Sequence, residues 1–121
     1  MKSFCRFVED NYIPIRELPH MKRVRGESYS KIVRIDARKF KERWEHDHQG
    51  EKLDWNPGRM ERLKGIEAYD SYPLVCIDWK GDPDITDGRH RIATAAMRGL
   101  KIDVATPPKD NLPPEILAEG N

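Results

Sequence analysis

The apolar positions of the chain fall into short segments that alternate between strand-like and helix-like patterns. Residues 12–18, 31–35, 74–79 and 101–105 carry β-branched and aromatic side chains at alternate or consecutive positions, which predicts strands. Residues 37–46 and 59–68 place apolar side chains three or four positions apart, which predicts two amphipathic helices. This order predicts an α/β (α+β) fold with a small mixed sheet and helices packed on it.

Local signals refine these segments. Pro14 predicts an edge position for the first strand, and Asp36 is a good N-cap for the helix that follows it. Phe40 and Trp44 lie four residues apart on one face of that helix, so we expect them in the core rather than as a base-stacking platform. Residues 47–58 are polar and form a loop that could act as a lid.

Residues 84–100, DITDGRHRIATAAMRGL, carry the strongest local pattern. They predict a strand that ends at Thr86, a turn at Asp87-Gly88, and a helix from Arg89 that closes on a left-handed C-cap at Gly99. Free N–H groups and the positive end of the helix dipole would meet at this turn, and glycine would let a phosphate approach the backbone.

The basic residues at this helix start strengthen the prediction of an anion site. Arg89, His90 and Arg91 stand where the dipole disfavours cations, and a bound anion would offset that cost. The alternative is a common turn followed by a solvated basic face. A second basic stretch, residues 19–26, is either a solvated loop or a further phosphate contact through Lys22, Arg23 or Arg25.

Composition limits the classes of function. The chain has 121 residues and a net charge of +1, which fits one domain and argues against a strongly basic nucleic-acid binder. We expect a domain over residues 1–106 and a proline-rich tail over 107–121, with a short last helix from Glu115. The two cysteines, Cys5 and Cys76, do not make a disulfide framework. No apolar run is long enough for a membrane span or typical of a signal peptide, so we expect a cytoplasmic protein.

A metal site is not expected. His46 and His48 are spaced as HxH, but the sequence offers no second cluster of ligands with metal-site spacing.

The string TDGRHRIATAAMRGLKIDV, residues 86–104, resembles the motif of the ParB/sulfiredoxin superfamily, which has Asp-Gly-x-x-Arg after a strand and then a helix of small residues. Asp87, Gly88, His90, Arg91 and Gly99 match that pattern, as does Ala95. The segments YPLVCIDWKGDPDI and YIPIREL resemble the hairpin that precedes the motif and the opening strand of the family. The resemblance implies a nucleotide-binding fold in which Thr86, Gly88, Arg89, His90 and Arg91 hold the phosphates of ATP, ADP or CTP with Mg²⁺, and in which Lys22 and Arg23 face the nucleotide.

The resemblance leaves the activity open. Sulfiredoxin-type reduction needs a thiolate where this chain has Arg89, so we exclude it. Partition-type DNA recognition needs a helix-turn-helix domain that this sequence does not contain. We therefore expect a nucleotide-binding domain, with slow phosphohydrolase or phosphotransferase activity as one form of it. Asp87 and Glu17 are its candidate acids, and Asp87 either orients His90 or a metal-bound water, or caps the helix. A DNA-binding protein or nuclease that uses the same phosphate site is the alternative, and a degenerate member that acts by protein contact is a further one.

Overall fold

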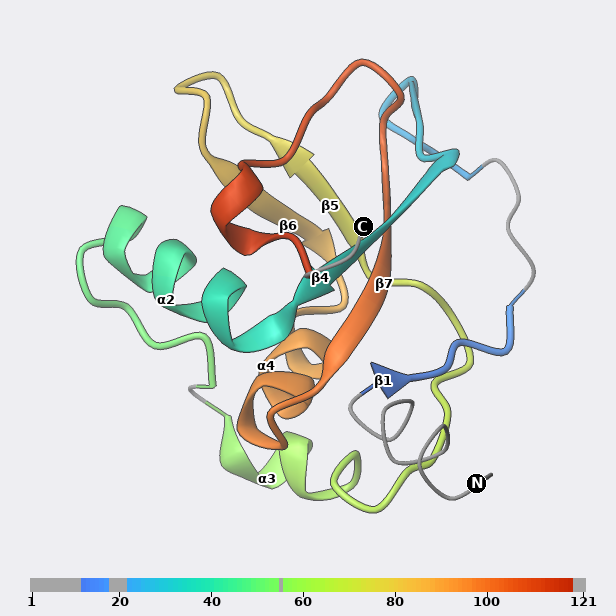
Figure 1. Ribbon diagram of the computed structural model, residues 1–121, viewed down its shortest axis with the longest axis vertical. Coiled ribbons are helices and arrows are strands. Elements are labelled where there is room, and N and C mark those ends of the chain that lie inside the picture. The colour runs from blue at the N-terminus through green and yellow to red at the C-terminus, as the bar shows by residue number, and fades with distance from the viewer. Residues whose placement is uncertain (1–11, 18–21, 55, 119–121) are drawn as a thin grey trace, which may run out of the picture.

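A mixed sheet carries the fold, and its central strand is β7 (Lys101–Thr106) (Figure 1). The computed structural model describes residues 12–17, 22–54 and 56–118. Within these residues β7 pairs antiparallel with β4 (Lys31–Asp36) along its whole length. On its other edge it pairs parallel with β1 (Tyr12–Ile13) at its start and with β5 (Leu74–Ile77) at its end. The fifth strand, β6 (Pro83–Asp87), is antiparallel to β5, so the small mixed sheet of an α/β domain is confirmed.

Helices α2 (Ala37–Asp47) and α4 (Arg89–Met97) pack on each other beside the sheet, and α3 (Pro57–Glu61) lies below α4 (Figure 1). Asp36 caps α2 as predicted, because its carboxylate accepts from the backbone N–H groups of Arg38 and Lys39 at 3.1 Å. Phe40 and Trp44 are buried in the core, which confirms the prediction from their spacing. None of the helices formed by the described residues is long and apolar enough to cross a membrane.

Helix α4 lies close to the strands because its inner positions are small. Ala93 and Ala95 are fully buried, and Ala96 is nearly so. The helix ends in the left-handed C-cap predicted at Gly99, which has φ +71°. The N–H of Leu100 donates to the carbonyl of Ala95 at 2.8 Å, and that of Gly99 donates to Ala96 at 3.0 Å. This cap directs the chain straight into β7.

Three elements are shorter than predicted. The strand predicted over residues 12–18 is only β1, Tyr12–Ile13, because Pro14 has no N–H group with which to continue the pairing; Ile15 then makes a single bridge to Tyr69. The helix predicted over residues 59–68 is only α3, Pro57–Glu61, and turns follow it to Gly65, where glycine disfavours further helix. The strand predicted over 74–79 ends at Ile77, because the Asp78 carboxylate accepts from the N–H groups of Lys80 and Asp82 at 2.9 Å and forms a tight turn.

The basic stretch 19–26 is described from residue 22 onwards. It enters a short hairpin of β2 (Arg23–Val24) and β3 (Glu27–Ser28), turned by Arg25 and Gly26 at φ +53° and +84°.

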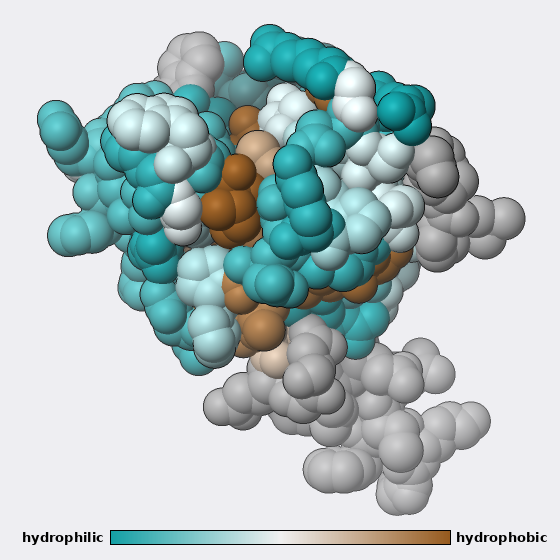
Figure 2. Space-filling view, turned by 90° about the horizontal axis from the view of Figure 1, so that it is seen from above, coloured by the Kyte–Doolittle hydropathy of each residue, from teal (hydrophilic) through white to brown (hydrophobic). Residues whose placement is uncertain are grey.

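Seen from above, the surface is mostly hydrophilic, with a narrow strip of apolar side chains (Figure 2).

The segment after β7 packs on the domain as far as Ala118. It contains a short 3₁₀ helix, η1 (Pro114–Ile116), close to the last helix predicted from Glu115. Ile116 is fully buried beside α2, and the N–H of Ala118 donates to the carbonyl of Arg34 at 3.2 Å. The proline-rich segment therefore contributes side chains to the core.

Gly88 joins β6 to α4 in a conformation that suits glycine, with φ +93°. A Cβ atom at this position would lie 2.7 Å from Cβ of Pro73 and 2.9 Å from a terminal nitrogen of Arg91. The sequence suggested that glycine here leaves room for a phosphate. The structure corrects that reason, because Pro73 and Arg91 of the same chain fill the space.

We expect Gly88→Ala to be far more destabilising than Gly81→Ala. Gly81 has nearly the same φ, +88°, but a Cβ atom there would meet no described atom within 4 Å beyond its chain neighbours. Both variants suffer the left-handed strain of about 1–2 kcal/mol, and only Gly88→Ala adds an overpacking cost of about 1–3 kcal/mol. Urea denaturation of both variants measures the difference, and equal losses of unfolding free energy would contradict it.

Candidate functional site

A cleft of about 650 Å³ opens at the junction of β6 and α4. The predicted site residues from Thr86 to Arg91 all line it, so the structure brings the motif together in one place. Its remaining walls come from α2, from α3 and the turns after it, and from the middle of β6. The complete lining is Trp44, Arg59, Arg62, Leu63, Ile66 and residues 84–91.

The N-terminus of α4 faces this cleft without a side-chain cap. Gly88 is the N-cap residue, and no side chain among the described residues caps the helix there. Asp87 therefore does not cap α4, contrary to the interpretation favoured from the sequence, because it still belongs to β6. Its carboxylate instead lies 3.7 Å from a guanidinium nitrogen of Arg91. The positive end of the α4 dipole thus faces the cleft, where it favours an anion.

Arg89 fastens the loop after α2 to the start of α4. Its Nε donates to the carbonyl of Leu53 at 2.9 Å, and its terminal nitrogens contact the carbonyl of Lys52 and the carboxylate of Glu51. The guanidinium also lies over the Trp44 ring, 4.9 Å from its centre. Arg89 lines the cleft, but its guanidinium bonds to residues 51–53, which lie within the loop over residues 47–58 that the sequence suggested as a lid.

Arg91 is committed to the chain in the same way. One terminal nitrogen donates to both the carbonyl and the hydroxyl of Ser71, at 2.5 and 2.6 Å. The other faces Asp87. Arg91 therefore holds the segment before β5 against the start of α4. Because its nitrogens already face Ser71 and Asp87, its guanidinium would favour an anion in the cleft through its positive charge rather than through direct hydrogen bonds.

His90 lies in a strongly positive environment. Burial lowers the pKa of its imidazole below the ordinary 6.5, and the cationic side chains of Arg59 and Arg89 lower the pKa further. Its Nε2 atom is buried. An anion in the cleft would relieve the repulsion that these neighbouring cations impose.

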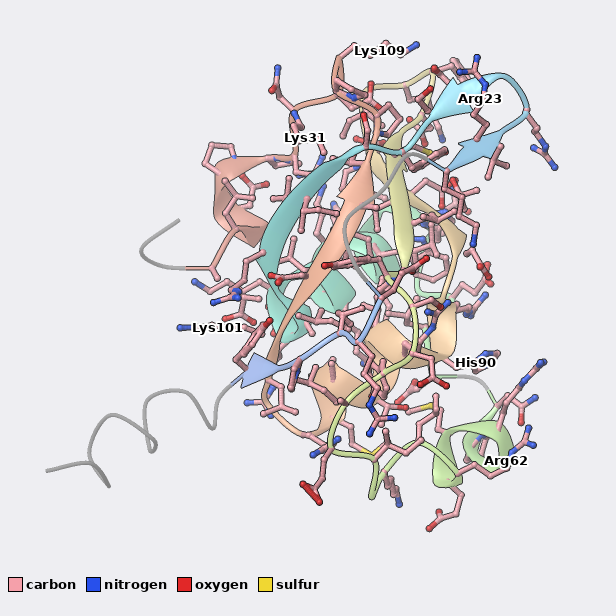
Figure 3. The ribbon with its side chains drawn as sticks, turned by 90° about the vertical axis from the view of Figure 1, so that its right-hand side faces the viewer. Arg23, Lys31, Arg62, His90, Lys101 and Lys109 are labelled. Atoms are coloured by element: carbon pink, nitrogen blue, oxygen red, sulfur yellow. The ribbon has the colours of Figure 1, made fainter. Side chains whose placement is uncertain are left out.

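Arg59 and Arg62 are cleft residues that sequence reasoning did not place in the site. Both are exposed, and neither guanidinium makes a hydrogen bond or an ion pair with any residue that the structure describes. Figure 3 shows Arg62 and His90 at the same end of the molecule. A signal in the sequence could have found Arg59 and Arg62. They follow Pro57, which starts a helix, and they are three residues apart, so both lie on one face of a helical turn.

Trp44 and Asp84 also line the cleft, and the sequence analysis did not predict either of them as a site residue. The indole N–H of Trp44 donates to Oδ1 of Asp84 at 3.2 Å, and the ring stacks on His48 at a centroid distance of 3.9 Å. His48 is thus held by Trp44, and its ring Nδ1 lies 2.7 Å from the Trp44 carbonyl. Within the described residues, no group of three or more histidine, cysteine or acidic side chains gathers in a way that could hold a metal ion.

Other candidate residues lie outside the cleft. Arg23 bonds to Ser28 and Gly26 in its own hairpin, at the opposite end of the molecule from His90 (Figure 3). Lys22 is exposed beside that hairpin, and neither lines the cleft. Glu17 does not line it either, since its carboxylate accepts from the N–H of Tyr72 at 3.1 Å.

The structure also places Thr86 and Cys76. The hydroxyl of Thr86 lies 2.8 Å from that of Tyr29, so this cleft residue already has a partner. Cys76 is a free thiol, and Cys5 lies outside the described residues.

Comparison of the chain with known protein families, with curated proteins and with solved structures finds no match. A function for the cleft must therefore be inferred from its geometry.

We expect His90 to make the protein less stable in mild acid. Its pKa is lowered in the folded state, so the folded protein binds fewer protons than the unfolded chain near pH 6. Its contribution to stability is full above the unfolded pKa of 6.5 and is lost as pH falls toward the lowered folded pKa. Urea denaturation at pH 7.5 and 5.5 should show that the free energy of unfolding falls less between these pH values for His90→Gln than for the wild type. Removal of the exposed His46 by His46→Gln should leave the wild-type loss in place, and a similar loss in all three proteins would refute the role of His90.

Proposed function

We propose that this chain is a nucleotide-binding domain of the ParB/sulfiredoxin type, whose cleft binds the phosphate groups of ATP, ADP or CTP. The observation that carries the proposal is the crowding of cations around an uncapped helix N-terminus. Arg59, Arg62 and His90 line the same cleft as the start of α4. Burial lowers the pKa of His90, and the charges of Arg59 and Arg89 lower it further, which is the effect expected where cations crowd together.

Phosphate chemistry fits this arrangement better than other anions do. The first-turn N–H groups of α4 offer several donors that converge on one point, and arginine forks match pairs of phosphate oxygens. A chain of two or three phosphates could contact the helix start and the two uncommitted arginines, Arg59 and Arg62, together. A single carboxylate is too small to do so.

The order of elements supports the family assignment within the proposal. A strand, β6, leads through a left-handed glycine into a short helix of small residues, α4, which a second glycine joins to the central strand β7. This is the order that the resemblance of residues 86–104 implies. It includes Thr86 to Arg91, six of the thirteen residues that line the cleft.

Magnesium would accompany a nucleoside triphosphate in this cleft. Mg²⁺ bound to phosphates takes one or two carboxylates from the protein, and the exposed carboxylate of Asp87 lines the cleft beside the helix start. If the domain also transfers or hydrolyses a phosphoryl group, Asp87 is the acid in position to orient the attacking oxygen, whereas Glu17 is not.

We expect the double variant Arg59→Gln/Arg62→Gln to bind triphosphates at least tenfold more weakly than the wild type. Loss of a charge-assisted hydrogen bond costs about 1.5–3 kcal/mol, which exceeds the roughly 1.4 kcal/mol that corresponds to tenfold. The melting temperature should change little, since these guanidiniums make no bond within the described residues. Calorimetric titration with Mg·ATP, Mg·CTP and inorganic triphosphate gives the affinities, and Arg25→Gln in the distant hairpin is the charge-matched control.

Two results would contradict the proposal. One is a wild type that binds none of these compounds at millimolar concentration. The other is a double variant that binds them as tightly as Arg25→Gln does. Displacement of bound nucleotide by short DNA, with a steep dependence on salt, would instead favour the nucleic-acid alternative.

We also expect nucleotide affinity and protein stability to respond to pH in opposite directions. A bound phosphate favours the protonated imidazole, so the pKa of His90 should rise on binding from its lowered value. Binding should then be tighter at pH 6 than at pH 8. Titration of the phosphate itself is the same for every variant, so the comparison of wild type with His90→Gln isolates the histidine. An identical change of affinity in both proteins would exclude it from the phosphate contact.

A further inference from the structure

One carboxylate occupies a place in the cleft where a site built for phosphate alone would gain nothing from it. Asp84 lines the same cleft as Arg59, Arg62 and His90, and its side chain is 39 % exposed. A carboxylate repels phosphate and lowers the affinity of the whole cleft for anions. Asp84 therefore suggests a ligand with a second, non-phosphate part.

The carboxylate of Asp84 is held in a fixed position through one oxygen. Oδ1 accepts from the indole N–H of Trp44 at 3.2 Å and from the N–H of Ile85 at 2.9 Å. Nε2 of His48 lies 3.8 Å from the same oxygen. Oδ2 makes no hydrogen bond with any residue in the described part of the chain, so it keeps its capacity to accept from a ligand.

Trp44 makes this position rigid and cannot itself bind a base. The residue is 4 % exposed, and its ring lies between His48 on one side, 3.9 Å away, and the guanidinium of Arg89, 4.9 Å away. Both contacts are with side chains of the domain, so a nucleobase has no free face to stack on. The part that Trp44 plays in the cleft is to present Asp84.

The spacing along β6 sets the size of the ligand. Four residues of extended chain separate Asp84 from Gly88, which corresponds to about 13 Å at the usual rise of a strand. That length exceeds a phosphate group and is comparable with a nucleoside di- or triphosphate. Leu63, Ile66 and Ile85 supply apolar wall in the same cleft.

From this geometry we infer that Asp84 binds the nucleoside part of the ligand by accepting a hydrogen bond from a sugar hydroxyl or an exocyclic amine. The inference rests on the proposed function, since it places the phosphates at the start of α4. It assigns Asp84 as a residue that distinguishes nucleotides from inorganic polyphosphate. The carboxylate weakens binding of every anion, and only a ligand with a suitably placed donor regains that loss.

The sign of an affinity change tests this inference. Asp84→Asn keeps an oxygen that can accept from Trp44 but removes the negative charge. We expect it to bind Mg·triphosphate about twofold or more tightly than the wild type, because repulsion is lost. We expect the better bound of Mg·ATP and Mg·CTP to bind about tenfold more weakly, since the amide nitrogen that replaces Oδ2 donates and cannot accept the hydrogen bond of the ligand. Asp87→Asn is the matched control, because it removes the same charge from the same cleft and should change the affinities for both ligands in the same direction.

The outcomes separate the inference from the proposed function. If Asp84→Asn tightens nucleotide and triphosphate alike, the inference is overturned while the phosphate site stands. If it weakens both, Asp84 acts on the shared metal or phosphates, and the inference is again overturned. If the wild type binds neither ligand, the proposed function itself fails.

Nucleotide analogues identify the donor. Dideoxy sugars lack the 2′ and 3′ hydroxyls, while UTP and ITP replace the exocyclic amine of CTP and ATP with oxygen. Asp84 contacts the group whose removal weakens wild-type binding but no longer affects Asp84→Asn. If every analogue binds the two proteins in the same ratio as the parent nucleotide, Asp84 reads neither group and the inference is wrong.

Discussion

The close contact between Gly88 and Pro73 determines where the cleft lies. Pro73 directly precedes β5, and its carbonyl accepts from the N–H of Ala105 in β7 at 2.9 Å. Gly88 follows β6 and starts α4, at a separation from Pro73 that leaves no room for a Cβ atom. Arg91 closes the same junction through Ser71. Because three strands and one helix are fixed at this point, the first-turn N–H groups of α4 face the cleft in one defined direction.

The cationic residues around this junction have different tasks. Arg89 and Arg91 adjoin His90 in the sequence, and a motif would treat all three as phosphate ligands. In the structure Arg89 holds residues 51–53 and Arg91 holds Ser71, so both contribute first to the shape of the cleft. The guanidiniums that line the cleft and make no bond within the described residues belong to Arg59 and Arg62. Under the proposed function, the shape of the cleft and its ligand affinity depend on different arginines, so mutations can change one without the other.

Local patterns predicted the parts of the fold that short-range physics determines. The cap at Asp36, the left-handed Gly99 and the burial of Phe40 and Trp44 each depend on a few neighbouring residues, and all are confirmed. The contents of the cleft depend on contacts far apart in the chain, and no local pattern encodes them. Asp84 is 40 residues from Trp44, and Arg89 is 36 residues from Leu53.

Net charge is a poor guide to what such a domain binds. The chain carries only +1 overall, yet the cleft gathers Arg59, Arg62, Arg89 and Arg91 around the start of one helix. Local potential at short range, rather than total charge, decides the affinity for a phosphate, because salt screens charges beyond about 10 Å. The acidic residues Asp84 and Asp87 in the same cleft then limit that affinity for any anion. A cleft with both signs of charge in fixed positions binds simple phosphates less tightly than an all-cationic one, and it gains selectivity for ligands that carry donors as well as phosphates.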